Sequence, residues 1–120
     1  MMFVLDTNVV IYLQKGLLLE SLPIAHYAIS VITEIELRAY PGITVIQEQW
    51  LKRFVNDVQV INLTDSIKEQ TIKLRKERLL KLPDAIVCAT ALLEQAVLLT
   101  NDKKLHEING LQCRALELRI

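Results

Sequence analysis

The sequence predicts an α/β fold, a three-layer α/β/α sandwich around a central, mostly parallel sheet of four to five strands. Short apolar runs alternate along the chain with longer segments whose apolar residues recur at helical spacing. Strands that alternate with helices form parallel sheets covered on both faces, and right-handed crossovers restrict their connections. The 120 residues, 52% of them hydrophobic, suffice for one domain with a buried core. We therefore expect residues 1–120 to form a single domain.

The first part of the chain contains two predicted strands with a helix between them. Residues 2–5 are a short apolar run, which is typical of a buried strand. Residues 8–22 follow with helical periodicity, and Gly16 is a candidate point of interruption because glycine weakens helices. Residues 27–31 are predicted to form the second strand, which Pro23 precedes.

The middle of the chain is predicted to contain two helices and a third strand. The first helix covers residues 33–40 and ends at the dipeptide Pro41-Gly42, a strong breaking signal. Residues 44–56 form an amphipathic segment with helical spacing of its apolar side chains. Residues 58–61 are the third predicted strand.

The last part of the chain begins with a charged helix at residues 64–80. Pro83 opens another helix that extends to about residue 95, because proline in the first helical turn loses no hydrogen bond. Residues 97–100 are the fourth predicted strand. Three further elements are expected after it: a short helix from Asp102, a turn at Asn109-Gly110, and an edge strand at residues 113–118.

Four acidic residues are expected at the carboxyl edge of this sheet. Asp6 directly follows the first strand and Asp102 follows the fourth, whereas Glu36 and Asp84 lie in early helical turns. The active crevice of such sheets lies outside the carboxyl ends of the strands. Neighbouring carboxylates repel each other, and a divalent cation with a preference for oxygen ligands, such as Mg²⁺, relieves that repulsion. The pattern therefore predicts a metal site that can activate water for attack on a phosphodiester.

Each acid also has an ordinary structural explanation. Asp6 could cap the helix that follows it, and Glu36 could form a capping box with Thr33. Asp84 in a first helical turn would complement the helix dipole, and Asp102 could begin a turn. Only the joint occurrence of the four acids at one edge favours a metal site.

Four segments resemble the sequence motifs of the PIN-domain family, particularly of its VapC-like toxins. They occur in the family's order and cover nearly the whole chain: residues 3–8, 29–37, 82–91 and 98–102. The resemblance implies a PIN fold, endoribonuclease activity that depends on Mg²⁺ or Mn²⁺, homodimerisation, and inhibition by a small antitoxin protein. It also implies the site residues, with catalytic and metal-binding roles for Asp6, Glu36, Asp84 and Asp102, and with Asn8 and Thr100 as polar helpers.

The choice of Glu36 over Glu34 rests on that second motif, in which the acid before the leucine is the functional one. Two residues apart on a helix, the side chains of Glu34 and Glu36 point about 200° apart, so only one of them can face the crevice.

Basic residues are concentrated just before Asp84. The net charge of zero does not indicate nucleic-acid binding, so contacts with RNA must come from local clusters. Residues 73–78 contain four basic side chains, and Lys81 follows them. The candidates for contacts with RNA phosphates are Arg75, Arg78 and Lys103, with Lys104 as a neighbour of the last. A solvated surface is the alternative explanation for each of them.

Composition restricts the setting in which the protein works. Cys88 and Cys113 are too few for a disulfide framework, so we expect both to be reduced. Asp6 interrupts the first apolar run and no basic segment precedes it, which argues against a signal peptide. The apolar stretch at residues 17–19 is too short to cross a bilayer. We expect a cytoplasmic protein with no membrane partner, and the slight apolar surplus favours a dimer or a bound protein.

Other functional classes fit less well. A haloacid-dehalogenase-like enzyme needs a second aspartate two residues after Asp6, where this chain has Asn8. A receiver domain, which is a non-enzymatic binding module, needs an aspartate at the end of its third strand, where this chain has Ile61-Asn62. A PIN-type nuclease of RNA processing or DNA metabolism stays open as an alternative, because one metal site can serve any phosphodiester.

Overall fold

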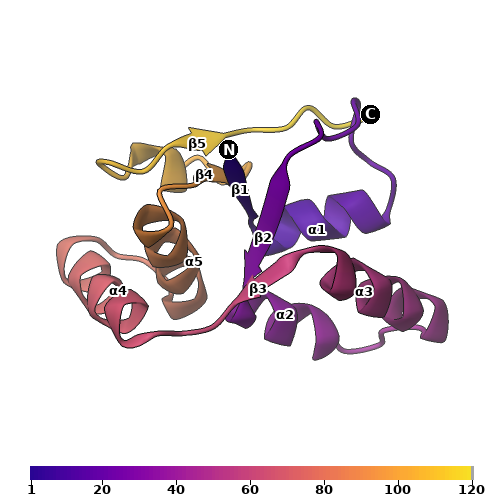
Figure 1. The fold of residues 1–120 in the computed structure, drawn as a ribbon, viewed down its shortest axis with the longest axis horizontal. Coiled ribbons are helices and arrows are strands. Elements are labelled where there is room, and N and C mark those ends of the chain that lie inside the picture. Colours follow the sequence, from indigo (N-terminus) through magenta and orange to yellow (C-terminus); the bar gives the residue numbers. More distant parts are fainter. Residues whose placement is uncertain (120) are drawn as a thin grey trace.

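A five-stranded parallel sheet lies between two layers of helices in the computed structural model of the chain, which describes residues 1–119 (Figure 1). The strand order is β3-β2-β1-β4-β5, and every pair is parallel. The predicted α/β architecture with a parallel sheet is confirmed. The strands are β1 (Met2–Leu5), β2 (His26–Ser30), β3 (Gln59–Ile61), β4 (Val97–Leu99) and β5 (Cys113–Arg114).

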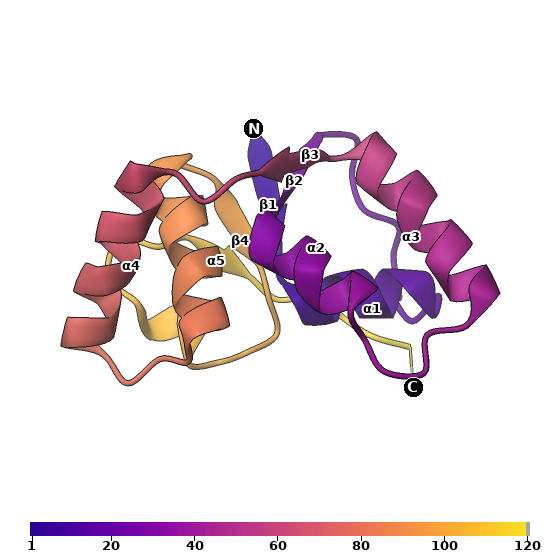
Figure 2. The same ribbon diagram turned by 90° about the horizontal axis from the view of Figure 1, so that it is seen from below.

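The helices are divided unequally between the two faces of the sheet. Figure 2 shows α4 and α5 together on one side, and α1, α2 and α3 on the other. Their bounds are α1 (Thr7–Gln14), α2 (Val31–Arg38), α3 (Val45–Asp57), α4 (Asp65–Glu77) and α5 (Leu82–Leu93), followed by the short 3₁₀ helix η1 (Leu105–Glu107). No helix within residues 1–119 has both the length and the apolar character that a bilayer crossing would need.

The alternation of side chains along the strands produces two hydrophobic cores. Successive side chains of a strand point to opposite faces of a sheet. In β1, Phe3 and Leu5 pack with the layer of α1, α2 and α3, whereas Val4 packs with α4 and α5. Helix α5 is buried continuously from Ala85 to Ala91, because it lies between the sheet and α4.

Helix α1 is shorter than predicted. It ends at Gln14, and Gly16 then adopts the left-handed conformation at φ 67°, which reverses the chain. The predicted helical continuation to residue 22 is therefore wrong. Leu18 instead forms a β-bridge with Leu118 from the end of the chain.

Other element boundaries also differ from the predictions. Helix α2 begins at Val31, because the Ser30 hydroxyl accepts a hydrogen bond from Ile32 N and caps it. Helix α4 ends at Glu77 and does not continue to residue 80. The edge strand β5 has two residues in place of the six expected at 113–118.

Leu98 provides a direct test of this core. Its side chain in β4 is fully buried, so Leu98→Ala should lower the free energy of unfolding by about 2–5 kcal/mol, measured by urea denaturation. Leu93→Ala is the matched control, because Leu93 in α5 is 44% exposed, and its loss should stay below about 1 kcal/mol. Equal losses for the two variants would contradict this assignment of the core.

Candidate active site

The sheet has one point where the chain's winding direction reverses, between β1 and β4. From β1 the chain winds through β2 to β3 on one side, while β4 and β5 extend the sheet on the other. Parallel sheets bind ligands outside the carboxyl ends of the strands at such a point. Asp6 directly follows β1 and Thr100 directly follows β4, and the Asp6 N–H donates to Leu99 O at 3.0 Å across the gap.

Asp6 is held from two sides. Its Oδ1 accepts a hydrogen bond from Thr7 N at 2.8 Å and so caps α1, and its Oδ2 accepts from Thr100 Oγ1 at 2.7 Å. The residue is only 7% exposed. Burial raises the pKa of the Asp6 carboxyl, and the two hydrogen bonds partly offset that effect, while the charge of Asp102 adds to it. The capping role and a place in the acidic cluster are thus combined in one residue.

Asp102 is connected to Asp6 through Thr100. The Thr100 hydroxyl, which donates to Asp6, also accepts from Asp102 N at 3.1 Å. Asp102 Oδ1 in turn accepts from Lys104 N at 3.1 Å and closes a tight turn. Thr100 is completely buried, so its hydroxyl has one fixed set of partners. Thr100 is predicted as a polar helper of the acids, and in the structure its hydroxyl links Asp6 to Asp102.

Glu36 is connected to the same edge by a residue that the sequence analysis missed. Thr7 Oγ1 donates to Glu36 Oε1 at 2.7 Å and also lies 3.1 Å from the buried hydroxyl of Thr33. Thr33 lies within α2, so the capping box considered for Thr33 and Glu36 is not formed. The position of Thr7 as the first residue of α1, next to Asp6, was the available signal.

Glu34 and Asn8 lie outside this network. Glu34 forms an ion pair with Arg38 at 3.2 Å along α2, as expected if Glu36 faces the crevice. Asn8 is exposed on the first turn of α1, and the hydrogen bonds described above use Thr7 in its place.

Asp84 completes the acidic cluster from the first turn of α5. Helix α5 runs against β4, which follows it directly, so its first turn lies at the carboxyl edge of the parallel sheet. Burial raises the pKa of the Asp84 carboxyl above its usual value. The negative charges of the other three acids, Asp6, Asp102 and Glu36, raise this pKa further. The four predicted acids thus lie within electrostatic range of one another.

The donor set suits a hard divalent cation. Within residues 1–119 the ion pairs are Arg38–Glu34 and Lys68–Asp65, so none of the four acids is neutralised by a direct ion pair there. In the same part of the chain, no three His, Cys, Asp or Glu side chains stand close enough to enclose an ion directly. Mg²⁺ usually keeps several waters and binds through one or two carboxylates plus substrate phosphates, which this arrangement can accommodate.

Basic side chains line a hollow together with two of the acids. This hollow has a volume of about 360 Å³, and we call it the cationic hollow. Its lining is Arg75, Leu79, Leu80, Lys81, Asp84, Asp102, Lys104 and Leu105. Of the predicted substrate contacts, Arg75 is therefore placed beside the acids, whereas Arg78 and Lys103 are not among the lining residues. Arg78 instead donates from Nη2 to Glu107 O at 2.7 Å and joins the end of α4 to η1.

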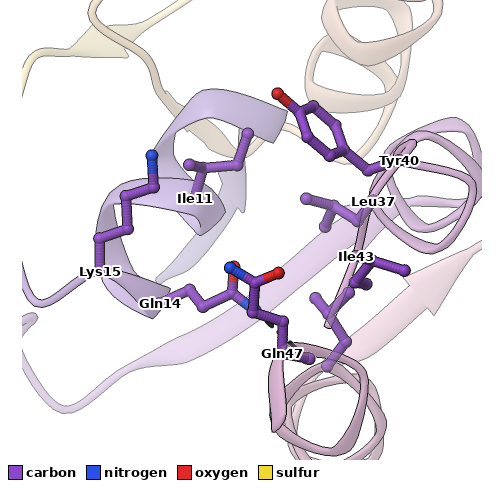
Figure 3. Close-up of a pocket in the computed structure, with 8 residues that line it drawn as sticks. Ile11, Gln14, Lys15, Leu37, Tyr40, Ile43 and Gln47 are labelled. Carbon is purple, nitrogen blue, oxygen red and sulfur yellow. Dashed lines mark hydrogen bonds between the residues drawn. The ribbon is translucent and has the colours of Figure 1, made fainter. Parts of the chain in front are cut away.

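A second hollow lies among α1, α2 and α3 (Figure 3). It has a volume of about 130 Å³ and a largely apolar lining that includes Ile11, Leu37, Tyr40 and Ile43. Leu37, which lines this hollow, directly follows Glu36 of the acidic cluster in the sequence. Tyr40 at its rim is 62% exposed.

Solved structures with a similar fold come from bacterial toxin–antitoxin systems. A chain in the VapBC2 structure from Rickettsia felis, bound to a DNA fragment from its promoter, matches with a TM-score of 0.82 and 21% identity, covering 98% of this chain and 100% of that one. VapBC-1 from nontypeable Haemophilus influenzae matches with a TM-score of 0.75 and 27% identity, covering 96% and 98%. A toxin–antitoxin complex from Klebsiella pneumoniae matches with a TM-score of 0.68 and 34% identity, covering 90% and 93%.

A search of curated proteins found no match. The sequence profile of one family, described as the PIN domain, matches residues 3–111 and so includes all four acids of the cluster. The match extends over most of the chain, and the parallel sheet agrees with the solved structures above. The chain therefore belongs to the PIN-domain family.

Proposed function

We propose that this protein is an endoribonuclease that depends on Mg²⁺ or Mn²⁺ and that acts as the toxin of a toxin–antitoxin pair. PIN domains are nucleases, and the similar solved structures are toxin–antitoxin complexes. The observation that carries the proposal is the acidic cluster, in which Asp6 and Asp102 share the Thr100 hydroxyl and Glu36 is held by Thr7.

The acids would hold the cation, with Asp6, Asp84 and Asp102 nearest the β1–β4 junction and Glu36 on the α2 side. When bound, the cation supplies a nucleophilic water and neutralises charge on the phosphodiester. Thr100 keeps the Asp6 carboxylate oriented, and both residues are buried. Thr7 orients Glu36, whose carboxylate can accept a proton from an attacking water.

We extend the proposal to a small antitoxin as the protein partner. The Klebsiella pneumoniae complex, at 34% identity, supports this extension. The apolar hollow of Figure 3 could take a hydrophobic side chain of such a partner, and Leu37 in its lining directly follows Glu36 in the sequence.

Homodimerisation belongs to the same proposal, and large apolar side chains such as Ile24 and Leu79 are fully exposed in the single chain. Sedimentation velocity of the free and partner-bound protein measures both associations.

Replacement of Asp6 tests the reaction. Asp6→Asn keeps a side-chain oxygen that can cap α1 but removes the charge, so cleavage of single-stranded RNA in Mg²⁺ should fall roughly 100-fold or more. Asp57→Asn, the same change at an exposed residue of α3, should cleave like the wild type. Equal initial rates for Asp6→Asn and the wild type would remove Asp6 from the mechanism. Growth arrest on expression of the wild type but not of Asp6→Asn distinguishes a toxin from a processing nuclease.

Thr7 is predicted to act by positioning Glu36. Thr7→Val removes the hydrogen bond to Glu36 Oε1 and should lower kcat about 10-fold. Thr7→Ser keeps the hydroxyl and should restore the rate. The Mg²⁺ concentration for half-maximal activity should rise in Thr7→Val alone, which a general loss of packing would not produce. Similar rates for the Val and Ser variants would argue against this role.

Metal-free stability should depend on the charge of Asp84. Since the folded state raises its pKa, this carboxyl favours folding while protonated, and the benefit is lost as pH rises through the folded-state pKa. In a chelator at neutral pH, Asp84→Asn should therefore raise Tm by about 2–5 °C, and the gain should shrink toward about pH 4. Mg²⁺ should then stabilise the wild type more than the variant.

The matched control for this experiment is Glu69→Gln, which removes a charge from an exposed position of α4. Its Tm should change little at either pH. An Asp84→Asn protein that is less stable than the wild type without metal would contradict the proposed repulsion among the acids.

A further inference from the structure

We propose that the cationic hollow binds the backbone phosphate next to the scissile phosphate of a single-stranded RNA. Arg75, Lys81 and Lys104 would hold that phosphate, while a divalent cation held by the acids would face the reacting one. The inference rests on the proposed nuclease function and adds to it the path of the substrate strand, across the α4–α5 loop and the turn that follows β4.

The hollow contains both of the charges that such a substrate requires. Asp84 and Asp102 line one part of it and belong to the acidic cluster, so a ligand in the hollow lies beside the candidate reaction centre. Its volume of about 360 Å³ falls near the lower limit for ligand sites, which leaves room for one nucleotide at a time. Leu79, which is fully exposed, adds apolar surface that suits a sugar or a base.

The three cations are available for a phosphate. The direct ion pairs within residues 1–119 are Arg38–Glu34 and Lys68–Asp65, so none of the three is neutralised in this way. Arg75 donates from Nε to Leu80 O at 3.3 Å, which orients the guanidinium and uses one of its five N–H donors. The backbone N–H of Lys104 donates to Asp102 Oδ1 at 3.1 Å, which holds the backbone of this residue beside the acid and leaves its ammonium group outside the bond.

Lys81 lines the hollow together with Asp84. It is the residue before α5 and precedes Asp84 by three positions. Its positive charge lowers the pKa of Asp84, against the stronger effects of burial and of the other acids, so the two side chains are within electrostatic range. A phosphate held by Lys81 would thus lie near Asp84 as well.

The chain offers matched controls for two of these cations. Lys103 adjoins Lys104 and Lys76 adjoins Arg75, and both controls are exposed residues that do not line the hollow. A general effect of net charge would act equally on a hollow residue and on its neighbour. A phosphate site in the hollow would act on Arg75 and Lys104 alone.

The test measures RNA binding by fluorescence anisotropy, in Mg²⁺ and in the Asp6→Asn background, with a labelled single-stranded RNA about 12 nucleotides long. Lys104→Ala and Arg75→Ala should each weaken binding about 5- to 10-fold and reduce the slope of log K against log salt by about 0.7. Lys103→Ala and Lys76→Ala should stay within about twofold of the parent. In the active enzyme, the hollow variants should raise KM more than they lower kcat.

A second arm identifies the phosphate. An uncharged methylphosphonate is placed at single positions along the RNA, after the cleavage position has been mapped. At the phosphate next to the scissile one, it should weaken binding to the parent protein more than Lys104→Ala does, because it removes the charge that all three cations face. It should weaken binding to Lys104→Ala less than binding to the parent, because one of the contacts that it removes is already absent in that variant.

The outcomes separate this inference from the proposed function. If the wild type cleaves RNA but Lys104→Ala and Arg75→Ala bind it like their controls, the phosphate site is overturned and the nuclease proposal stands. Additive effects of the methylphosphonate and Lys104→Ala would also overturn the site. If the wild type neither binds nor cleaves RNA in Mg²⁺, the nuclease proposal fails and the site fails with it.

Discussion

The hydrogen bond from Thr100 Oγ1 to Asp6 Oδ2 is the interaction on which the acidic cluster depends. It joins the carboxyl ends of two neighbouring strands, β1 and β4, at the point where the winding of the sheet reverses. A buried carboxylate is costly without hydrogen-bond donors. Asp6 has one donor after each strand, Thr7 N after β1 and Thr100 Oγ1 after β4. The same Thr100 hydroxyl accepts from Asp102 N, so one buried side chain orients two acids.

Acidic and basic side chains around this bond lie close together without being paired in the described part of the chain, which is typical of a functional site. Acids of like charge lie within range of one another, which raises the pKa of Asp84 and disfavours the folded state at neutral pH. Cations line the cationic hollow beside Asp84 and Asp102, and within residues 1–119 they form no direct ion pairs with those acids. A protein that needed only stability would neutralise these charges against each other. Their separation is typical of a site that receives both a cation and an anion.

The sequence predicted the parts of the fold that depend on local pattern. The apolar runs identified the parallel strands, and Asp6 and Asp102 follow from their places after β1 and β4. Tertiary contacts decided the rest. Residues 17–22 have helical periodicity, but the left-handed Gly16 and the bridge to Leu118 override it. The sequence does not show which of the neighbouring lysines Lys103 and Lys104 lines the hollow. The turn that Asp102 closes determines that it is Lys104.

Thr100 also determines when the acidic cluster can form during synthesis. It is separated from Asp6 by 94 positions, and Asp102 follows it, so a ribosome must translate most of the message before the two strand ends can meet. Because a domain generally folds as a unit, the cluster forms only after β4 is available. A nascent chain that stops short of β4 would carry Asp6, Glu36 and Asp84 without their organising hydroxyl. An unfinished polypeptide that lacks β4 therefore cannot assemble the complete cluster.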